Sequence, residues 1–408
     1  MRALPGLGLV VWVLTGTAVP VSAAQDPARS PARLVTGRII DAGSGNPVVR
    51  AVVSLPGTLV QTTTDDRGGF SLPGSARSVV ILVEALGFRP KSVTLTDTDP
   101  HRDIALEPAW TPEQIRALAL QQNDPDYRPR VEQPAYPRGR GPRVLIDEGH
   151  HNAHTATGRY RAFASILEQD GFVVEASGSA FTPELLKTAG IVVIATPIDG
   201  MDDGTVTNRS PFKAAEIIAL RRWVDSGGAL LVISDHMPVA GALDPLLRAF
   251  GVEGDNGYVF AFAADRLVSR PMVFRRQDGS LGAHPITAGR TGSERLDSVA
   301  TFTGFAFRAP APFEPLLQLR DDSYSVQTPN WLAPAFDSPR IPVGGWFQGA
   351  AARIGRGRVV VNGEAAMFTA QVRGENRRKN GLTSPEAGQN LQFLLNIMHW
   401  LSGLLDPV

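Results

Sequence analysis

The pattern of apolar and polar residues divides the chain into a first part that predicts strands only and a second part that alternates strands with helices. Between residues 34 and 107, short apolar runs are separated by turn clusters such as residues 41–47 and 65–69. Evenly spaced short strands are typical of a small β-sandwich. From residue 143 on, apolar runs alternate with amphipathic segments. This alternation predicts a doubly wound α/β domain on a parallel sheet, over residues 143–404.

The second domain also predicts its individual elements. Helices are expected over 159–169, 183–188, 211–225 and 243–250, and a last one from 386 to about 404. Strands are expected at 144–146, 173–176, 191–195, 229–233 and 356–361. Residues 255–345 mix short β-like pieces with proline-rich loops and predict no clear order of elements.

Residues 108–142 are expected to connect the two domains. Thr111, Pro112 and Gln114 form a helix start, which predicts a helix to about residue 122. Residues 124–142 are rich in proline, arginine and tyrosine, and this composition predicts an extended linker.

The first 24 residues predict an export signal. Arg2 supplies a positive start, residues 7–19 are apolar, and residues 22–24 are small. The apolar core is too short for a comfortable membrane span, although an uncleaved anchor is the alternative. No later segment is long and apolar enough to span a bilayer. We therefore expect an exported protein, periplasmic or extracellular, with no membrane span after cleavage.

Composition excludes several classes of function. The chain has 40 Lys plus Arg and 40 Asp plus Glu, so it lacks the basic surplus typical of nucleic-acid binding. It has no cysteine, which excludes disulfides, cysteine nucleophiles and thiolate metal ligands.

The chemistry-bearing residues gather where predicted strands end. Three of the seven histidines lie within residues 150–154, just after the strand at 144–146. In open parallel sheets, ligands bind beyond the carboxyl ends of the strands. The residues expected there are Asp147, Glu148, His150, His151, Asn152 and His154 after one strand, Thr196 and Asp199 after another, Ser234, Asp235 and His236 after a third, and Glu364 after the last.

One hypothesis for these residues is a metal site. His150, His154 and His236, with Asp147, Asp235 or Glu364, are donors that suit zinc or manganese. A metal with an open position would activate water for hydrolysis. The spacing is not diagnostic, because the chain has no His-Glu-x-x-His motif. The alternative is structural: these polar groups cap helices and tie loops by hydrogen bonds.

Three further hypotheses use the same region. Ser234 with His236 as base suggests a nucleophile, but the Gly-x-Ser-x-Gly elbow is absent. Paired carboxylates of a glycosidase would come from Asp147, Glu148, Asp235 and Glu364. A small-molecule ligand would be bound by His151, Asn152, Ser234 and Gln348, the last beside Trp346, which either stacks a sugar or packs in the core.

The first domain resembles a known family. The matching stretches are residues 37–41, 45–47, 51–55, 64–70 and 85–88. Together they resemble the carboxypeptidase regulatory-like domain, which implies a prealbumin-like sandwich with the general shape of carbohydrate-binding modules. The resemblance implies fold more than function. The His-x-x-Glu pattern of zinc carboxypeptidases is absent, so that activity is not expected.

The second domain resembles the class I glutamine amidotransferase-like superfamily. The stretches that carry the resemblance are residues 144–152, 192–197, 223–235 and 355–364. They imply a flavodoxin-like α/β fold. The superfamily's cysteine would follow Ile233, where this chain has Ser-Asp-His, so glutamine hydrolysis through a thioester is excluded. Non-catalytic relatives of the fold occur beside sugar-processing domains and in binding roles.

The leading hypothesis is therefore an exported cell-envelope binding or accessory protein whose ligand is a glycan or another small molecule. The alternative is a metal-dependent hydrolase centred on His150, His154, His236 and Asp147. Tight convergence of those four side chains would favour the hydrolase. An aromatic rim, with histidines tied to the backbone, would favour binding.

Overall fold

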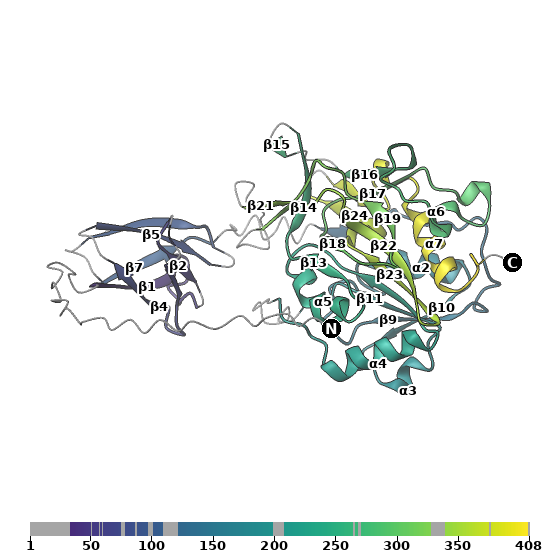
Figure 1. Cartoon of the computed structure of the whole chain (residues 1–408), viewed down its shortest axis with the longest axis horizontal. Coiled ribbons are helices and arrows are strands. Elements are labelled where there is room, and N and C mark those ends of the chain that lie inside the picture. The colour runs from purple at the N-terminus through teal and green to yellow at the C-terminus, as the bar shows by residue number, and fades with distance from the viewer. Residues whose placement is uncertain are drawn as a thin grey trace, which may run out of the picture. The chain divides into compact units, whose positions relative to one another are not determined.

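The computed structural model describes residues 33–49, 51–56, 58, 60–74, 78–85, 88–96, 101–108, 121–198, 208–263, 266–267, 271–327, 339–374 and 377–406. The expected signal at 1–24, nearly all of the expected helix at 111–122, and Asp199 lie outside these residues. The chain forms two compact units, the first mostly of residues up to 104 and the second mostly of residues from 105 on (Figure 1). No helix in the described parts is long and apolar enough to cross a membrane.

The first unit consists of two antiparallel sheets, in agreement with the expected sandwich. Their strand orders are β4-β1-β7 and β3-β2-β5-β6. Alternating side chains of these strands, such as Ile39, Val53, Leu72 and Ile81, are fully buried. The bounds are β1 (Arg33–Asp41), β2 (Val52–Ser54), β3 (Gln61–Thr63), β4 (Gly69–Gly74), β5 (Ser78–Glu84), β6 (Lys91–Thr96) and β7 (His101–Leu106).

The second unit is built on a sheet with the order β10-β9-β11-β12-β23-β22-β18-β13. The five strands from β10 to β23 run parallel, and β9 lies between β10 and β11. The chain places β10 on one side of β9 and then β11 and β12 on the other side, and this is the order of a doubly wound fold. The expected strands are confirmed, with bounds β9 (Arg143–Asp147), β10 (Val173–Ser177), β11 (Ile191–Ala195), β12 (Ala229–Ile233) and β23 (Gly357–Asn362).

Helices cover both faces of the parallel strands, because successive side chains of a strand point to opposite faces. Val144 and Ile146 pack with α2 and α7, whereas Leu145 packs in the cluster that holds α3, α4 and α5. Figure 1 shows the same division. The bounds are α2 (Arg161–Gln169), α3 (Pro183–Leu186), α4 (Ala214–Asp225), α5 (Val239–Arg248) and α7 (Asn390–Leu401).

The region without a clear sequence pattern adds antiparallel strands to this sheet and forms two small sheets, β15-β14-β20-β21 and β16-β17, while a third small sheet, β25-β24-β8, comes from segments outside that region. The long strand β22 pairs with β23, β18 and β19. The bounds are β13 (Glu253–Asp255), β14 (Tyr258–Ala263), β15 (Arg266–Leu267), β16 (Met272–Arg275), α6 (Pro285–Ala288), β17 (Ser298–Thr301), β18 (Ala306–Arg308), β19 (Glu314–Gln318), β20 (Ser323–Val326), β21 (Arg340–Pro342), β22 (Phe347–Ile354), β24 (Ala370–Arg373) and β25 (Arg378–Gly381).

Residues 124–142, expected as an extended linker, and the residues just before them, expected as the end of a helix, both pack on the second unit instead. Strand β8 (Gln122–Asn123) pairs with β24 of the second unit. Tyr127, Val131 and Tyr136 then pack against the core that holds α2 and α7. Prolines restrict the backbone here, but the apolar side chains between them still bury surface and bind the segment to the α/β unit.

Candidate functional site

The polar residues singled out in the sequence do gather at one edge of the sheet. Strands β9, β11, β12 and β23 are neighbours and parallel, so their carboxyl ends meet. Asp147 ends β9, Thr196 follows β11, Ser234 follows β12, and Glu364 lies two residues after β23. These residues nevertheless form two separate groups with different partners.

The first group is a buried ion triad of Asp147, His150 and Glu216. The Nδ1 atom of His150 lies 2.8 Å from Asp147 Oδ1, and its Nε2 atom lies 3.0 Å from Glu216 Oε1. Burial works against protonation, but the two carboxylates prevail and raise the pKa of His150 above its ordinary value. The rings of Phe181 and Phe212 pack on the imidazole. Both ring nitrogens are therefore occupied, and the geometry offers none to a metal.

Neighbouring residues complete this triad by hydrogen bonds. The amide of Asn152 donates to Asp147 Oδ2 at 3.0 Å and to the Ala195 carbonyl at 2.9 Å. Its Oδ1 accepts from the His150 backbone N–H at 3.1 Å. Glu148 accepts from the Ala156 N–H at 2.7 Å, as a cap in the loop before α2. Asn152 and Glu148 thus hold the loop in shape, as the structural alternative expected.

Gln348 and Ser234, two other residues expected to bind a ligand, are instead hydrogen-bonded within the protein. Gln348 is fully buried on β22, where its Oε1 accepts from Thr301 at 2.8 Å and its Nε2 donates to the Thr303 carbonyl at 2.6 Å. Ser234 is fully buried, and its hydroxyl donates to the Asp235 carbonyl at 3.3 Å. A nucleophile at Ser234 would need an accessible oxygen and an adjacent base, and the geometry supplies neither. His151 is exposed and has a positive φ of 53°.

The second group, which we name the strand-end cluster, consists of His154, Arg159, Tyr160, Asp235, His236, Tyr258 and Glu364. Electrostatic interactions connect its members: Arg159 with Asp235, Tyr160 with Glu364, and His154 with His236. Three of these residues follow β9 in the loop that leads into α2, and three follow β12 or β23. The cluster therefore spans the adjacent ends of the parallel strands.

His154 is the buried histidine of the cluster. Burial, with help from Arg159 and His236, lowers its pKa to about 3, so the ring is neutral at ordinary pH. Its Nδ1 atom lies 2.6 Å from the Thr196 hydroxyl. Thr196 has a positive φ of 45°, which is strained for a β-branched residue. Such strain concentrates at functional sites, and here it positions the hydroxyl that contacts His154.

Asp235 and His236 form the more accessible part of the cluster. Their side chains are 14% and 26% exposed. The Nδ1 atom of His236 lies 2.6 Å from the Met237 carbonyl, so Nδ1 carries a proton, and its Nε2 atom lies 3.8 Å from Asp235 Oδ1, beyond hydrogen-bond distance. The imidazole stacks on the ring of Tyr258 with 4.0 Å between ring centroids, and Tyr258 stacks on Phe260 with 6.0 Å between centroids. The result is a polar edge backed by an aromatic stack.

Glu364 lies behind Asp235 and is fully buried. Burial and the nearby Asp235 carboxylate raise the pKa of Glu364 well above its usual range. The backbone N–H groups of Ala366 and Met367, at 3.0 Å and 2.8 Å, oppose this shift without cancelling it. Tyr160 is also buried beside the two carboxyl groups, and its hydroxyl donates to the Ala365 carbonyl at 3.1 Å.

Sequence reasoning missed Arg159, Tyr160 and Tyr258. The first two open the helix after the histidine loop, so the expectation that ligands bind at strand ends could have included them. Tyr258 lies on β14, in the region without a readable pattern, and no sequence signal pointed to it. Arg373 at the end of β24 also acts electrostatically on Arg159.

A metal would need several donors that converge. In the described ranges, no group of three or more His, Asp or Glu side chains is arranged to hold a metal ion. The structure divides the expected donors: Asp147 and His150 belong to the ion triad, whereas His154 and His236 belong to the strand-end cluster.

Comparisons with known proteins give three further findings. Among curated proteins, no sequence matches the chain. The N-terminal domain of mmIFT52 is 17% identical over 64% of this chain and 97% of its own, with a TM-score of 0.44. A ThuA-like protein from Parabacteroides merdae is 14% identical over 64% and 90%, with a TM-score of 0.36.

Cytoplasmic protein STM3548 from Salmonella typhimurium is 9% identical over 64% of this chain and 98% of its own, with a TM-score of 0.38. At such scores these likenesses carry no argument about function. The family comparison is firmer and confirms the sequence expectation for the first domain: residues 34–107 match the carboxypeptidase regulatory-like domain.

Proposed function

We propose that the strand-end cluster binds a carbohydrate, and that the chain is an exported cell-envelope binding or accessory protein. The observation that carries the proposal is the edge formed by Asp235 and His236. It combines a partly exposed carboxylate, a partly exposed imidazole whose Nε2 lies 3.8 Å from that carboxylate, and the aromatic stack behind them.

The chemistry of this edge suits a sugar. Sugar hydroxyls are donors as well as acceptors, and a carboxylate such as Asp235 accepts two of them at once. Arg159, which is half-buried beside Asp235, supplies donors for ring or hydroxyl oxygens. The imidazole of His236, which is partly exposed and stacked on the buried Tyr258, offers a flat face to the apolar side of a sugar, while the polar groups fix the sugar's orientation. The histidines are tied to the backbone or to side chains, which fits a fixed binding surface better than a metal site.

The likeness of residues 143–404 to the amidotransferase-like superfamily is part of the same proposal. Binding without a cysteine nucleophile is consistent with Ser234, Asp235 and His236 following β12. Export rests on the pattern of residues 1–24. Fractionation of cells that express the full chain tests it, and protein found only in the cytoplasm would contradict export.

The main experiment is a glycan array on the purified full chain, followed by calorimetric titration with each glycan that binds. Asp235→Asn keeps the size of the side chain and removes its charge. We expect it to weaken binding at least tenfold, because a hydrogen bond to a charged group contributes about 1.5–3 kcal/mol. The matched control is Asp244→Asn on α5, whose carboxylate pairs with Arg248 and does not belong to the strand-end cluster.

Two outcomes would contradict the proposal. One is that no glycan binds on the array. The other is that Asp235→Asn and Asp244→Asn bind the glycan equally well, which would place the ligand elsewhere on the molecule.

A second candidate function is hydrolysis, favoured by the proximity of Asp235 to a carboxyl group of raised pKa. Pairs of carboxyl groups whose environments separate their pKa values are typical of glycoside cleavage. Glu364 is fully buried, so Asp235 would contact the substrate and Glu364 would tune its charge. A metal-dependent form of this hydrolase would have His154, His236 and Asp235 as its remaining donors, and these side chains would have to move to converge on one ion, since no three such groups of the described residues are arranged to hold a metal.

Hydrolysis of chromogenic glycosides by the wild type, abolished in Asp235→Asn, would support this second candidate over binding alone. Metal content measured by mass spectrometry, with His236→Ala beside it, tests the metal-dependent form. Stoichiometric zinc or manganese that is lost in His236→Ala would support a metal, and equal metal in both proteins would contradict it.

A further inference from the structure

A hollow of about 130 Å³ lies beside α2 and shares no residue with the strand-end cluster. We name it the α2 hollow. It lies between the start of α2 and the segment after β8, and Ala162 and Ala370 contribute small apolar side chains to its lining. Small side chains leave room there, so the polar groups around them decide what the hollow accepts.

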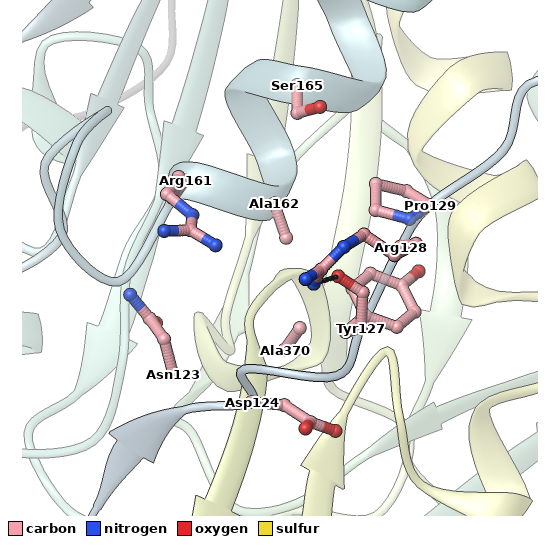
Figure 2. A pocket seen from close by; sticks show the side chains of 9 residues that line it. All are labelled: Asn123, Asp124, Tyr127, Arg128, Pro129, Arg161, Ala162, Ser165 and Ala370. Atoms are coloured by element: carbon pink, nitrogen blue, oxygen red, sulfur yellow. Dashed lines mark hydrogen bonds between the residues drawn. The ribbon is translucent and has the colours of Figure 1, made fainter.

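Two arginines line the α2 hollow from different elements. Arg161 is the first residue of α2, and Arg128 belongs to the segment after β8. Figure 2 shows Arg161 beside Ala162 on one side of the hollow and the guanidinium group of Arg128 reaching in from the other side, between Ala162 and Ala370. Arg128 donates only to the backbone carbonyls of Pro125, at 2.6 Å, and Tyr127, at 3.0 Å. Within the described residues, neither arginine has a carboxylate partner.

The only acidic residue of the lining does not offset these charges. Asp124 is buried and forms an ion pair with Lys379 on β25. Burial alone would raise the pKa of Asp124, but Lys379 and the Asp126 N–H bring it below the ordinary value. Asp124 and Lys379 therefore cancel each other, and the two arginines leave the α2 hollow with an excess of two positive charges.

The other groups of the lining add to the same preference. Burial raises the pKa of Tyr127 to about 12, so its phenol stays protonated. The start of α2 has no acidic residue in its first turn and no side-chain cap. A helix start carries partial positive charge, which favours an anion nearby. Two guanidinium groups, a phenol and a helix start thus surround a small volume.

We propose that the α2 hollow binds the oxyanion of a small acid, a carboxylate or a phosphate group. Guanidinium groups recognise both through paired, charge-assisted hydrogen bonds. The volume corresponds to about four water molecules at roughly 30 Å³ each, which is enough for the charged head of a small acid. The site is independent of the proposed glycan site and does not rest on it.

The test is calorimetric titration of the full chain with inorganic phosphate, glucuronate and neutral glucose, at low salt. We expect saturable binding of phosphate or glucuronate and none of glucose at this site. Stronger binding of phosphate would identify a phosphate group as the natural head group, and stronger binding of glucuronate would identify a carboxylate. Raising the salt concentration should weaken either, because exposed charges are screened.

Arg161→Gln should weaken the binding of whichever anion, phosphate or glucuronate, the wild type binds more tightly, by at least tenfold. The matched control is Arg222→Gln, which removes an exposed arginine from the surface of α4. Arg128→Gln is a second variant on the opposite wall. Asp235→Asn should leave the anion affinity unchanged, so the proposal for the glycan site and the proposal for the α2 hollow are tested independently. Failure of both anions to bind, or equal binding by Arg161→Gln and Arg222→Gln, would overturn the proposal.

Discussion

The ion triad and the strand-end cluster lie at the same edge of one sheet and both combine histidines with carboxylates, yet their side chains differ in hydrogen-bond partners and in exposure. In the triad, both nitrogens of His150 face carboxylates, and all three members are buried. In the strand-end cluster, His236 Nε2 lies 3.8 Å from Asp235, too far for a hydrogen bond, and both side chains are partly exposed. The difference teaches that saturation of hydrogen bonds, and not residue type, separates a structural histidine from one that is open to a ligand.

The strongest test of this comparison is His150→Ala. It would leave Asp147 and Glu216 buried with no cation between them. Removing one partner from a buried ion pair costs about 3–5 kcal/mol, so we expect a loss of that size in the free energy of unfolding. Urea denaturation followed by circular dichroism measures it. A loss below about 1 kcal/mol would show that the triad does not stabilise the fold.

The second prediction concerns pH and His154. The pKa of His154 is about 3 in the folded protein and 6.5 in an ordinary environment. Between these values the unfolded chain binds a proton that the native chain does not, so stability falls as pH decreases from 6.5 toward 3. The pKa of His284, lowered by burial to about 4, acts in the same direction.

His154→Gln should flatten the fall of the melting temperature between pH 6.5 and 4, because glutamine does not titrate. His284→Gln is the matched variant outside the cluster and should flatten it less. Melting curves at half-unit pH steps decide the matter. An unchanged slope in His154→Gln would mean that His154 has the same pKa in the folded and unfolded protein, which would contradict the burial argument.

The third prediction is that His236→Ala is much milder than His150→Ala. The variant loses the stack on Tyr258 and one bond to a backbone carbonyl, in a partly exposed position. We expect a loss of about 1 kcal/mol in urea denaturation. If His236→Ala destabilised the protein as much as His150→Ala, the contrast between the two groups would be wrong.

The smallest expected effect on stability is that of Asp235→Asn. Removing its charge relieves the repulsion of Glu364 and also weakens the attraction to Arg159, so the free energy of unfolding at pH 7 should change by less than about 1 kcal/mol. The same variant should lose the glycan. A destabilisation above about 2 kcal/mol would indicate a structural role for Asp235.

Much of the α/β unit could be predicted because its strands are continuous apolar runs. Residues 191–195 and 229–233 are fully buried on both faces, and such runs have one simple interpretation. The strands between residues 253 and 345 were not predictable, since they are short and their partners are distant in sequence. Strand β19, for example, pairs with β22 through an irregular register.

The sequence predicted where on the sheet the candidate site lies, but not which side chains contact one another there. The position of Asp147, Asp235 and Glu364 at strand ends was visible in the sequence, because a strand's end follows its apolar run. Their partners were not, because Glu216 lies 66 residues from His150 and reaches it only through the packing of α4. The role of each histidine depends on such distant partners.

The sequence by itself determined the two domains, the excluded cysteine chemistry and the edge of the sheet where polar residues collect, since these depend on local pattern and residue type. Only the tertiary structure decided the order of the strands, the division between the ion triad and the strand-end cluster, and the α2 hollow. Each of these depends on side chains that are remote in the chain, and distances between them are set by packing. Hydrogen-bond saturation and pKa are properties of that packing and not of any residue alone.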